Sequence, residues 1–256
     1  MGDSLVFSQP LARLWGLDRA LAGIRLVSFD VWNTLLRFEA IAGFIVEGLS
    51  EATGKPLSAV RTAFERARAE AKRARLRGEG GNPLLESQEM LAVALDAPLD
   101  RVRRGIAIGL LRAIEHVEEI VYPEALQALE TAARIAGKVA VLGNVLFWPG
   151  SYTRLLLEKA RLEHFIDFQL YADEIGLYKP DRRAFLQLCK EADVDPGEAV
   201  HVGDELTEDV AGALSAGMMA VWVNRSLREP VYMPEARLAA IPSLTLLGEA
   251  LQRLTH

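Results

Sequence analysis

The chain of 256 residues contains one cysteine, Cys189, and no long apolar run. A single cysteine excludes an intramolecular disulfide and is typical of a protein from a reducing compartment. No segment approaches the roughly 20 consecutive apolar residues that a membrane span needs. The first residues include Asp3 and lack the apolar stretch of a secretory signal. We therefore expect a cytoplasmic protein that does not insert in a membrane.

The sequence also lacks an excess of positive charge. It has 29 Lys and Arg residues against 35 Asp and Glu residues, which gives a net charge of −6. Proteins that bind nucleic-acid phosphates are usually basic, so we expect no nucleic-acid partner. Hydrophobic residues make up 50% of the chain and charged residues 25%. These are ordinary globular proportions, and the chain is long enough to bury a sizeable core.

One short apolar run lies near the start of the chain, and after residue 122 further runs alternate with helical patterns. Strands are expected at residues 24–29, 138–142, 168–171, 199–202 and 220–223. Helices are expected at residues 124–136, 150–160, 181–192 and 208–216. Apolar strands that alternate with helices are typical of a parallel sheet covered on both faces. We therefore predict an α/β fold with a Rossmann-like parallel-sheet core.

The stretch between the first and second expected strands has no strand pattern. It is rich in Ala, Arg, Glu and Leu, and its periodicity predicts helices at residues 39–53, 57–77, 85–95 and 98–119. We predict that residues 39–121 form an all-helical domain inserted into a core made of residues 1–38 and 122–256. A short amphipathic helix is expected within residues 1–22.

Polar and charged residues stand where the expected strands end. They are Asp30, Gly143-Asn144 and Gly203-Asp204, followed by Glu205, Glu208 and Asp209, with Lys179-Pro180 between the third and fourth strands. Ligands bind beyond the carboxyl ends of open parallel sheets. Because clustered carboxylates repel one another, they favour a bound cation, and Mg²⁺ suits carboxylates and a substrate phosphate oxygen.

This set of residue types suits phosphoryl transfer. A carboxylate beside a divalent cation can attack phosphorus and form an aspartyl-phosphate. The ammonium group of a lysine would neutralise charge on the nucleophile and on the transferred group.

In order and position, these residues resemble the four motifs of the haloacid dehalogenase superfamily, and the resemblance covers nearly the whole chain. The first motif, Asp-x-Asp-x-Thr, reads Asp30-Val31-Trp32-Asn33-Thr34. The second, a Ser or Thr, is matched in position by Gly143 before Asn144, and the third is Lys179-Pro180. The fourth is Gly203-Asp204 with Asp209. The resemblance implies that the helical insert is a cap of the C1 type.

The resemblance also implies a role for each residue of these motifs. Asp30 would be the nucleophile and a Mg²⁺ ligand, Trp32 would lend its backbone carbonyl to the ion, and Asp204 and Asp209 would complete the metal site. The phosphoryl group would be oriented by Thr34, Asn144 and the catalytic Lys179, with a backbone N–H at Gly143 in place of the usual hydroxyl. The implied function is Mg²⁺-dependent hydrolysis of a small anionic substrate, a phosphomonoester.

Trp32 keeps two alternatives open. Phosphatases of the superfamily carry a general-acid Asp there, and such a group is typically worth 10²–10⁴-fold in rate. The 2-haloacid dehalogenases carry an aromatic residue and use the nucleophilic Asp without metal, but they lack the Gly-Asp pair that Gly203-Asp204 retains. The other alternative is a catalytically weak protein that binds metal and phosphate. Glu205 or Glu208 could also replace Asp209 at the metal.

The insert carries a run of basic residues: Arg61, Arg66, Arg68, Lys72, Arg73, Arg75 and Arg77. They form either a solvated helix face or a surface from which one or two arginines reach an anionic substrate. His201 is expected to be buried and structural, and Cys189 to lie in the core. Trp148-Pro149-Gly150 either lines the mouth of the site or forms a turn that the aromatic ring anchors. No pattern in the sequence indicates the oligomeric state or the particular substrate.

Overall fold

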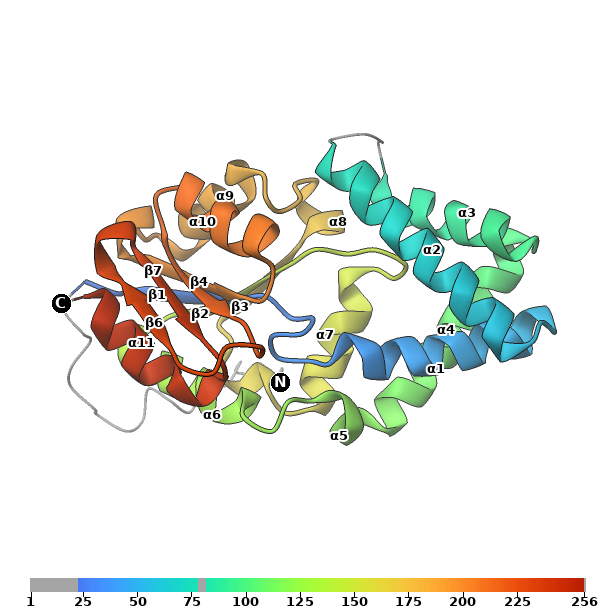
Figure 1. Cartoon of the computed structure of the whole chain (residues 1–256), viewed down its shortest axis with the longest axis horizontal. Helices are drawn as coiled ribbons and strands as arrows, with labels where there is room; N and C mark the ends of the chain where they lie inside the picture. The colour runs from blue at the N-terminus through green and yellow to red at the C-terminus, as the bar shows by residue number, and fades with distance from the viewer. Residues whose placement is uncertain (1–22, 78–81, 256) are drawn as a thin grey trace, which may run out of the picture.

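The computed structural model describes residues 23–77 and 82–255; the helix expected within residues 1–22 lies outside them. In this part of the chain, seven strands form one sheet in the order β3-β2-β1-β4-β5-β7-β6 (Figure 1). The strands are β1 (Leu26–Phe29), β2 (Val139–Gly143), β3 (Phe168–Tyr171), β4 (Ala199–Gly203), β5 (Met219–Val223), β6 (Val231–Met233) and β7 (Leu238–Ile241). Only β6 and β7 pair antiparallel. The predicted Rossmann-like α/β fold is confirmed.

Helices precede and follow the strands, as expected from the alternating pattern. They are α1 (Phe38–Thr53), α2 (Leu57–Leu76), α3 (Pro83–Leu95), α4 (Leu99–Glu115), α5 (Val117–Ile120), α6 (Ala125–Ala136), α7 (Gly150–Lys159), α8 (Ala172–Ile175), α9 (Arg182–Ala192), α10 (Gly212–Ser215) and α11 (Leu247–Leu254). Short 3₁₀ turns cover Glu163–Phe165, Pro196–Glu198, Pro234–Ala236 and Leu244–Leu246. Across residues 23–77 and 82–255, none of the helices has both the length and the apolar character that a bilayer crossing requires.

Two helices expected as single elements are divided. The helix expected at 98–119 is broken at His116, whose φ and ψ of −118° and 37° are not helical, so α4 ends there and α5 follows. The helix expected at 208–216 begins as a π-helical turn, η4 (Leu206–Ala211), before α10. The second deviation places side chains of the candidate site.

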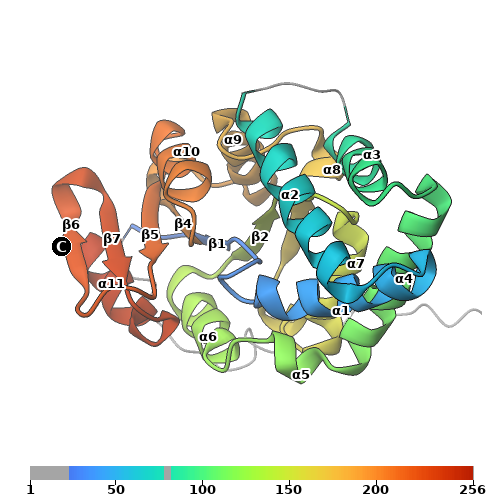
Figure 2. The ribbon, with the colours of Figure 1, turned by 45° about the vertical axis from the view of Figure 1, so that its right-hand side comes forward.

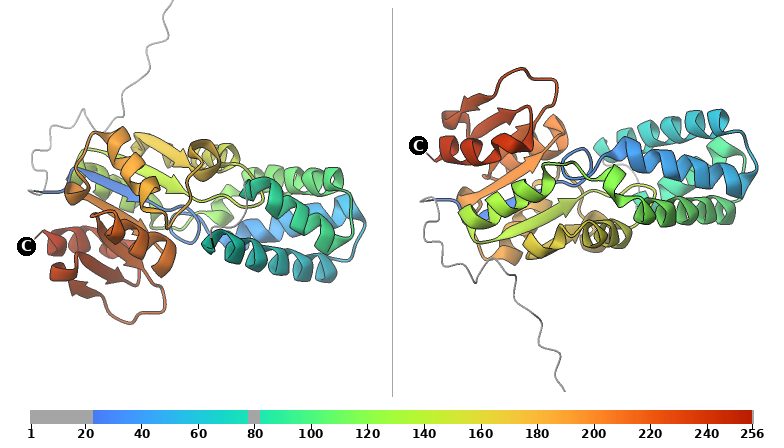
Figure 3. Two further views of the ribbon diagram at one scale, coloured as in Figure 1. Left: turned by 90° about the horizontal axis from the view of Figure 1, so that it is seen from above. Right: turned by 90° about the horizontal axis from the view of Figure 1, so that it is seen from below.

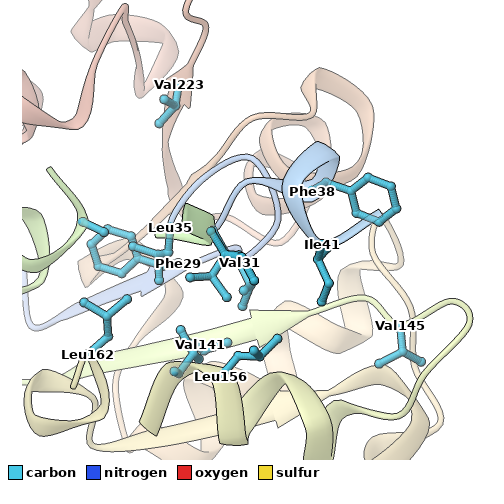
Figure 4. Close-up of a cluster of buried hydrophobic side chains, with 14 of the residues drawn as sticks. Phe29, Val31, Leu35, Phe38, Ile41, Val141, Val145, Leu156, Leu162 and Val223 are labelled. Atoms are coloured by element: carbon cyan, nitrogen blue, oxygen red, sulfur yellow. The ribbon is translucent and has the colours of Figure 1, made fainter. Parts of the chain in front are cut away.

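The sheet is buried because helices cover both of its faces. Alternate residues of β1 enter different clusters, Val27 and Phe29 on one face and Leu26 on the other. Helices α6 and α11 pack on the first face, and α9 and α10 on the second. Figure 4 shows Phe29 and Val141 meeting Leu156 and Leu162 within the first cluster. Because both faces are covered, the central strands are continuous apolar runs.

Helices α1–α4, which we call the helical insert, lie beyond the carboxyl ends of the central strands. Figure 3 shows the arrows of β1 and β2 pointing towards them, and Figure 2 shows them grouped apart from the sheet. Helices α1 and α4 pack closely because both present glycine: a Cβ at Gly48 would lie 2.3 Å from the carbonyl oxygen of Gly105. The assignment of residues 39–121 to a separate domain stays a prediction.

The chain enters and leaves the helical insert at neighbouring points. Leu36 forms a β-bridge with Val121. The Tyr122 N–H donates to the Leu35 carbonyl at 3.0 Å, and the Arg37 N–H donates to the Ile120 carbonyl at 2.7 Å. The two connecting segments are therefore hydrogen-bonded to each other.

Candidate active site

The candidate site begins where two neighbouring strands end. Strands β1 and β4 are parallel neighbours, and the Asp30 N–H donates to the Val202 carbonyl at 2.8 Å. Asp30 and Asp204 therefore emerge side by side at the same edge of the sheet. One carboxylate oxygen from each of Asp30, Asp204 and Asp209 lies within 4.8 Å of the others. The sequence-predicted metal-ligating side chains are thus brought together.

The π-helical turn η4 explains how Asp209 reaches this position. The Glu205 N–H donates to Oδ2 of Asp209 at 2.9 Å, and the Asp209 N–H donates back to the Glu205 carbonyl at 2.9 Å. Gly203 leaves the space that this arrangement needs, because a Cβ there would lie 2.3 Å from the Asp209 carboxylate. A residue with a side chain before Asp204 would therefore clash with the Asp209 carboxylate.

Lys179 is the cation of the cluster. Its side chain is 1% exposed, and its Nζ donates to Oδ1 of Asp30 and to Oδ1 of Asp209, each at 2.7 Å. Asn144 holds the backbone of this lysine from both sides, since its Oδ1 accepts from the Lys179 N–H at 2.9 Å and its Nδ2 donates to the Lys179 carbonyl at 3.0 Å. The end of β2 therefore positions the lysine.

Burial and mutual repulsion shift the pKa values of the acids in different directions. Burial, followed by the repulsion of neighbouring carboxylates, raises the pKa of Asp30 to about 7 and that of Asp204 to about 8. The pKa of Asp209 is lowered, because the attraction of Lys179 and the hydrogen bond from His201 outweigh its burial. Burial alone would lower the pKa of Lys179. The carboxylates of Asp209 and Asp30 outweigh burial and raise it.

The side chain of His201 contacts the Asp209 carboxylate. It is buried, as expected, with Nε2 3.2 Å from Oδ1 of Asp209 and Nδ1 2.8 Å from Oγ of Ser28. Burial lowers the pKa of His201, which favours the neutral ring. The Ser28 hydroxyl has one proton and also lies 3.3 Å from the Val200 carbonyl. When Ser28 donates to Nδ1, the neutral ring donates from Nε2 to Asp209 and orients this carboxylate. Cys189 is also buried, as expected.

The three remaining motif residues lie in different surroundings. Trp32 lines the cavity above Asp30, with its ring edge-on to Trp148 at a centroid distance of 5.5 Å. Thr34 is buried, and its Oγ1 has no hydrogen-bond partner within the described residues. Gly143 faces the ring of Tyr171, which a Cβ would approach to 2.7 Å. The Tyr171 ring therefore leaves no room for a side chain at this position.

The cavity over Asp30 has a volume of about 100 Å³. Its core side is formed by the three aspartates with Asn144, Glu205 and Glu208, and its insert side by Arg68, Lys72 and Arg75 of α2. Trp32, Phe38 and Trp148 supply an apolar wall. One side of the basic run therefore lines the cavity together with the core. Trp148 also lines the cavity, which is one of the two places expected for it.

Ion pairs join α2 to the core across this cavity. Arg75 Nη2 lies 2.7 Å from Oε1 of Glu208, and both side chains are more than nine-tenths buried. Oε2 of Glu208 accepts from Asn144 Nδ2 at 3.0 Å. Lys72 Nζ lies 2.5 Å from Oε1 of Glu205, where both side chains are partly exposed. A chain of contacts thus runs from Arg75 through Glu208 and Asn144 to Lys179.

Sequence reasoning missed this part of the site. The sequence indicates Glu208 only as a metal ligand. The spacing of the basic run does not distinguish Arg75 from the other basic residues. Arg225 had no signal at all: its Nη1 donates to the Asn33 carbonyl at 2.5 Å, and its guanidinium stacks 3.7 Å from the Tyr122 ring centroid. It holds the turn after the nucleophile against the segment that leaves the helical insert.

Comparison with known proteins places this geometry in a family. The sequence model for haloacid dehalogenase-like hydrolases matches residues 24–217. Over 132 residues the chain is 38% identical to phosphoserine phosphatase from Thermus thermophilus, a match that covers 51% of each protein. Over 146 residues it is 29% identical to (S)-2-haloacid dehalogenase 4A from Burkholderia cepacia, covering 57% of this chain and 61% of that enzyme. The matches thus span between half and two thirds of these relatives.

Solved structures extend the likeness to the full fold. The magnesium-bound hydrolase YfnB from Bacillus subtilis matches with a TM-score of 0.67 and 18% sequence identity. The match covers 89% of this chain and 98% of that one. At this identity, the likeness concerns the fold.

Proposed function

Because the chain belongs to the haloacid dehalogenase-like hydrolase family, we propose that it is a Mg²⁺-dependent phosphatase that hydrolyses small phosphomonoesters through an aspartyl-phosphate on Asp30. The observation that carries this proposal is the cluster of Asp30, Asp204 and Asp209, with oxygens within 4.8 Å of one another. Three carboxylates beside one lysine are an oxygen-rich set of the kind that a hard divalent cation takes.

The donor set fits Mg²⁺. Burial and mutual repulsion raise the pKa values of Asp30 and Asp204, so a cation between these carboxylates would favour their ionised forms. Asp30, Asp204, Asp209 and the backbone carbonyl of Trp32 would hold the ion. When bound, Mg²⁺ would neutralise the charge of the ionised carboxylates and of the phosphate group.

The chemistry divides into two displacements at phosphorus. A carboxylate oxygen of Asp30 attacks the phosphorus, the bond to the ester oxygen breaks, and the alcohol takes a proton from solvent. Water then attacks the phosphorus of the aspartyl-phosphate, the bond to the Asp30 oxygen breaks, and inorganic phosphate leaves. The Lys179 ammonium, 2.7 Å from Asp30, stabilises the negative charge that develops in both steps. The helical insert acts as the cap that closes over the site and excludes water.

Trp32 sets the expected rate of this reaction. The indole cannot exchange a proton near neutral pH, so protonation of the leaving alcohol lacks the usual side chain. We expect a slow phosphatase, since a positioned acid contributes about 10²–10⁴-fold. Replacing Trp32→Asp is expected to raise kcat, and thermal unfolding of the variant reports whether the loss of the ring contacts to Trp148 disturbs packing.

The test is phosphate release from a panel of small phosphomonoesters, measured with Mg²⁺ and with EDTA. Release that requires Mg²⁺ and is lost in Asp30→Asn supports the proposal. Release that persists in EDTA and in Asp30→Asn contradicts it.

A second candidate function is 2-haloacid dehalogenation without metal. It is favoured by Trp32, because the aromatic wall that this residue forms with Phe38 and Trp148 suits an apolar halocarbon. Asp30 would attack carbon and release halide. Halide release from 2-chloropropionate, unaffected by EDTA, together with silence across the phosphate panel, would select this function.

A further inference from the structure

Three cations of one helix line the cavity above Asp30. Arg68, Lys72 and Arg75 lie three or four residues apart on α2, so they share one face of the helix. That face is turned towards the carboxyl ends of β1 and β4, where the aspartates lie. A substrate whose phosphate group reaches Asp30 therefore extends towards this row of cations.

Two of the three cations are already neutralised by the core. Arg75 pairs with Glu208 at 2.7 Å and Lys72 pairs with Glu205 at 2.5 Å, and both glutamates also line the cavity. These pairs hold α2 against the core and leave little positive charge for a ligand.

Arg68 differs from the other two. Its ion pairs, to Glu39 at 3.4 Å and Glu65 at 3.6 Å, are longer, and both involve Nη1. The two glutamates are 72% and 45% exposed and do not line the cavity, so water weakens both interactions. Within the described residues, no acceptor contacts Nη2 or Nε of Arg68.

The head group of Arg68 is nevertheless held in place. Its guanidinium carbon lies 3.8 Å from the centroid of the Phe38 ring, in stacking distance, and Phe38 is itself part of the cavity wall. Phe38 is fixed in turn by stacking on Trp148, with ring centroids 6.1 Å apart. A stacked guanidinium with unpaired N–H groups along one edge is prepared for a planar, bidentate anion.

The cavity is small, about 100 Å³, and both Asp30 and Arg68 line it. One compact molecule that carries two anionic groups can therefore contact the core side and the insert side together. Of the anionic groups that a guanidinium binds, a carboxylate is planar and presents two oxygens in one plane, as the N–H groups of Arg68 do.

We infer that the substrate is a small phosphorylated carboxylic acid, whose phosphate meets Asp30 and whose carboxylate is bound by Arg68. This inference rests on the proposed phosphatase function. Arg68 is then the residue that determines specificity, while Lys72 and Arg75 hold α2 against the core.

The experiment compares two matched pairs of esters: 3-phosphoglycerate with glycerol 3-phosphate, and O-phosphoserine with O-phosphoethanolamine. The members of each pair differ in the carboxylate. We expect kcat/KM to be about 10- to 100-fold higher for the carboxylate member of at least one pair, the value of a charge-assisted bidentate contact. Arg68→Met should reduce that ratio to near one, mainly through KM, and Arg68→Lys should restore part of it.

Arg66→Met is the matched control, because Arg66 is exposed on another face of the same helix and is absent from the cavity. It should keep the ratio of the unmodified protein. Equal kcat/KM values within both pairs, or a ratio that survives Arg68→Met, overturn the inference and leave the phosphatase function standing. Failure to hydrolyse any ester with Mg²⁺ overturns the proposed function and the inference with it.

Discussion

The two sides of the cavity are built on different principles. The core side consists of short acidic side chains at and just after strand ends. Asp30 and Asp209 are buried and both accept from Lys179, and Asp204 beside them is half-buried. The insert side consists of long basic side chains on α2, whose exposure increases from Arg75 through Arg68 to Lys72. Backbone pairing in the sheet places the first group, whereas the packing of a helix against the core places the second. Under the proposed function, the core side defines the chemistry and the insert side selects the substrate.

The largest effect should come from Asp30, the proposed nucleophile. Asp30→Asn is nearly isosteric and is expected to lower kcat by at least about 10³-fold, since no other side chain can form the covalent intermediate. Because the pKa of Asp30 is raised, its ionised form is disfavoured in the folded protein, and the variant should unfold at no lower a temperature. Asp100→Asn, at an exposed position on α4, is the control for both measurements.

The next largest effect should be on stability. Lys179→Met leaves Asp30 and Asp209 without their shared cation and should cost about 3–5 kcal/mol of unfolding free energy, because it breaks a buried ion pair. Urea unfolding followed by circular dichroism measures this loss. Lys190→Met on α9, which is exposed, should change the value by less than about 0.5 kcal/mol. Equal losses in the two variants would contradict the role given to Lys179.

Metal and pH should act together on the core side. In EDTA, raised pKa values near 7 for Asp30 and 8 for Asp204 mean that the folded state binds more protons than the unfolded state. The free energy of unfolding should therefore fall as pH rises from the unfolded pKa of about 4 to the folded pKa values of about 7 and about 8. The last part of this fall lies between about pH 6.5 and about pH 9, above the titration of ordinary carboxylates. Mg²⁺ should offset this fall, by about 2–3 kcal/mol at saturation near 100 times its dissociation constant. Melting temperatures at the two pH values, with EDTA and with Mg²⁺, test this; a melting temperature in EDTA that rises with pH would contradict it.

The smallest effects should separate the two ion pairs of the insert side. Arg75→Met leaves Glu208 buried without its partner and should cost about 2 kcal/mol, with a fall in kcat because Glu208 also holds Asn144. Lys72→Met breaks a partly exposed pair and should cost less than about 1 kcal/mol. A double-mutant cycle with Glu208→Gln and Glu205→Gln gives the coupling energies. Similar coupling in both pairs would remove the distinction between them.

The same contrast explains what the sequence could predict. Apolar runs such as 138–142 and 199–202 were readable because both faces of the strands are covered. Asp30 was readable because it follows the apolar run 24–29 directly, and Asp204 because only Gly203 separates it from the run 199–202. In a parallel sheet, ligands bind beyond the carboxyl ends of the strands, so the residues that follow an apolar run are candidate site residues.

Other features depend on contacts that no local pattern encodes. β6 and β7 were not predicted, since β6 is three residues long and exposes Val231 and Met233. The π-helical turn at Leu206–Ala211 has the composition of an ordinary helix, and its shape follows from the hydrogen bonds between Asp209 and Glu205. The choice of Arg68, Lys72 and Arg75 from seven basic residues depends on how α2 is turned against the core.

The hydrogen-bonded segments at Leu36 and Val121 have a consequence for how such a protein can change over time. The segments that enter and leave the helical insert are hydrogen-bonded to each other. The insert therefore joins β1 to β2 as a short loop would. The length and sequence of the insert can diverge without altering the register of β1 against β2, or the spacing of the aspartates beyond them. Under the proposed function, substrate preference and catalytic chemistry are thus separately heritable parts of one chain.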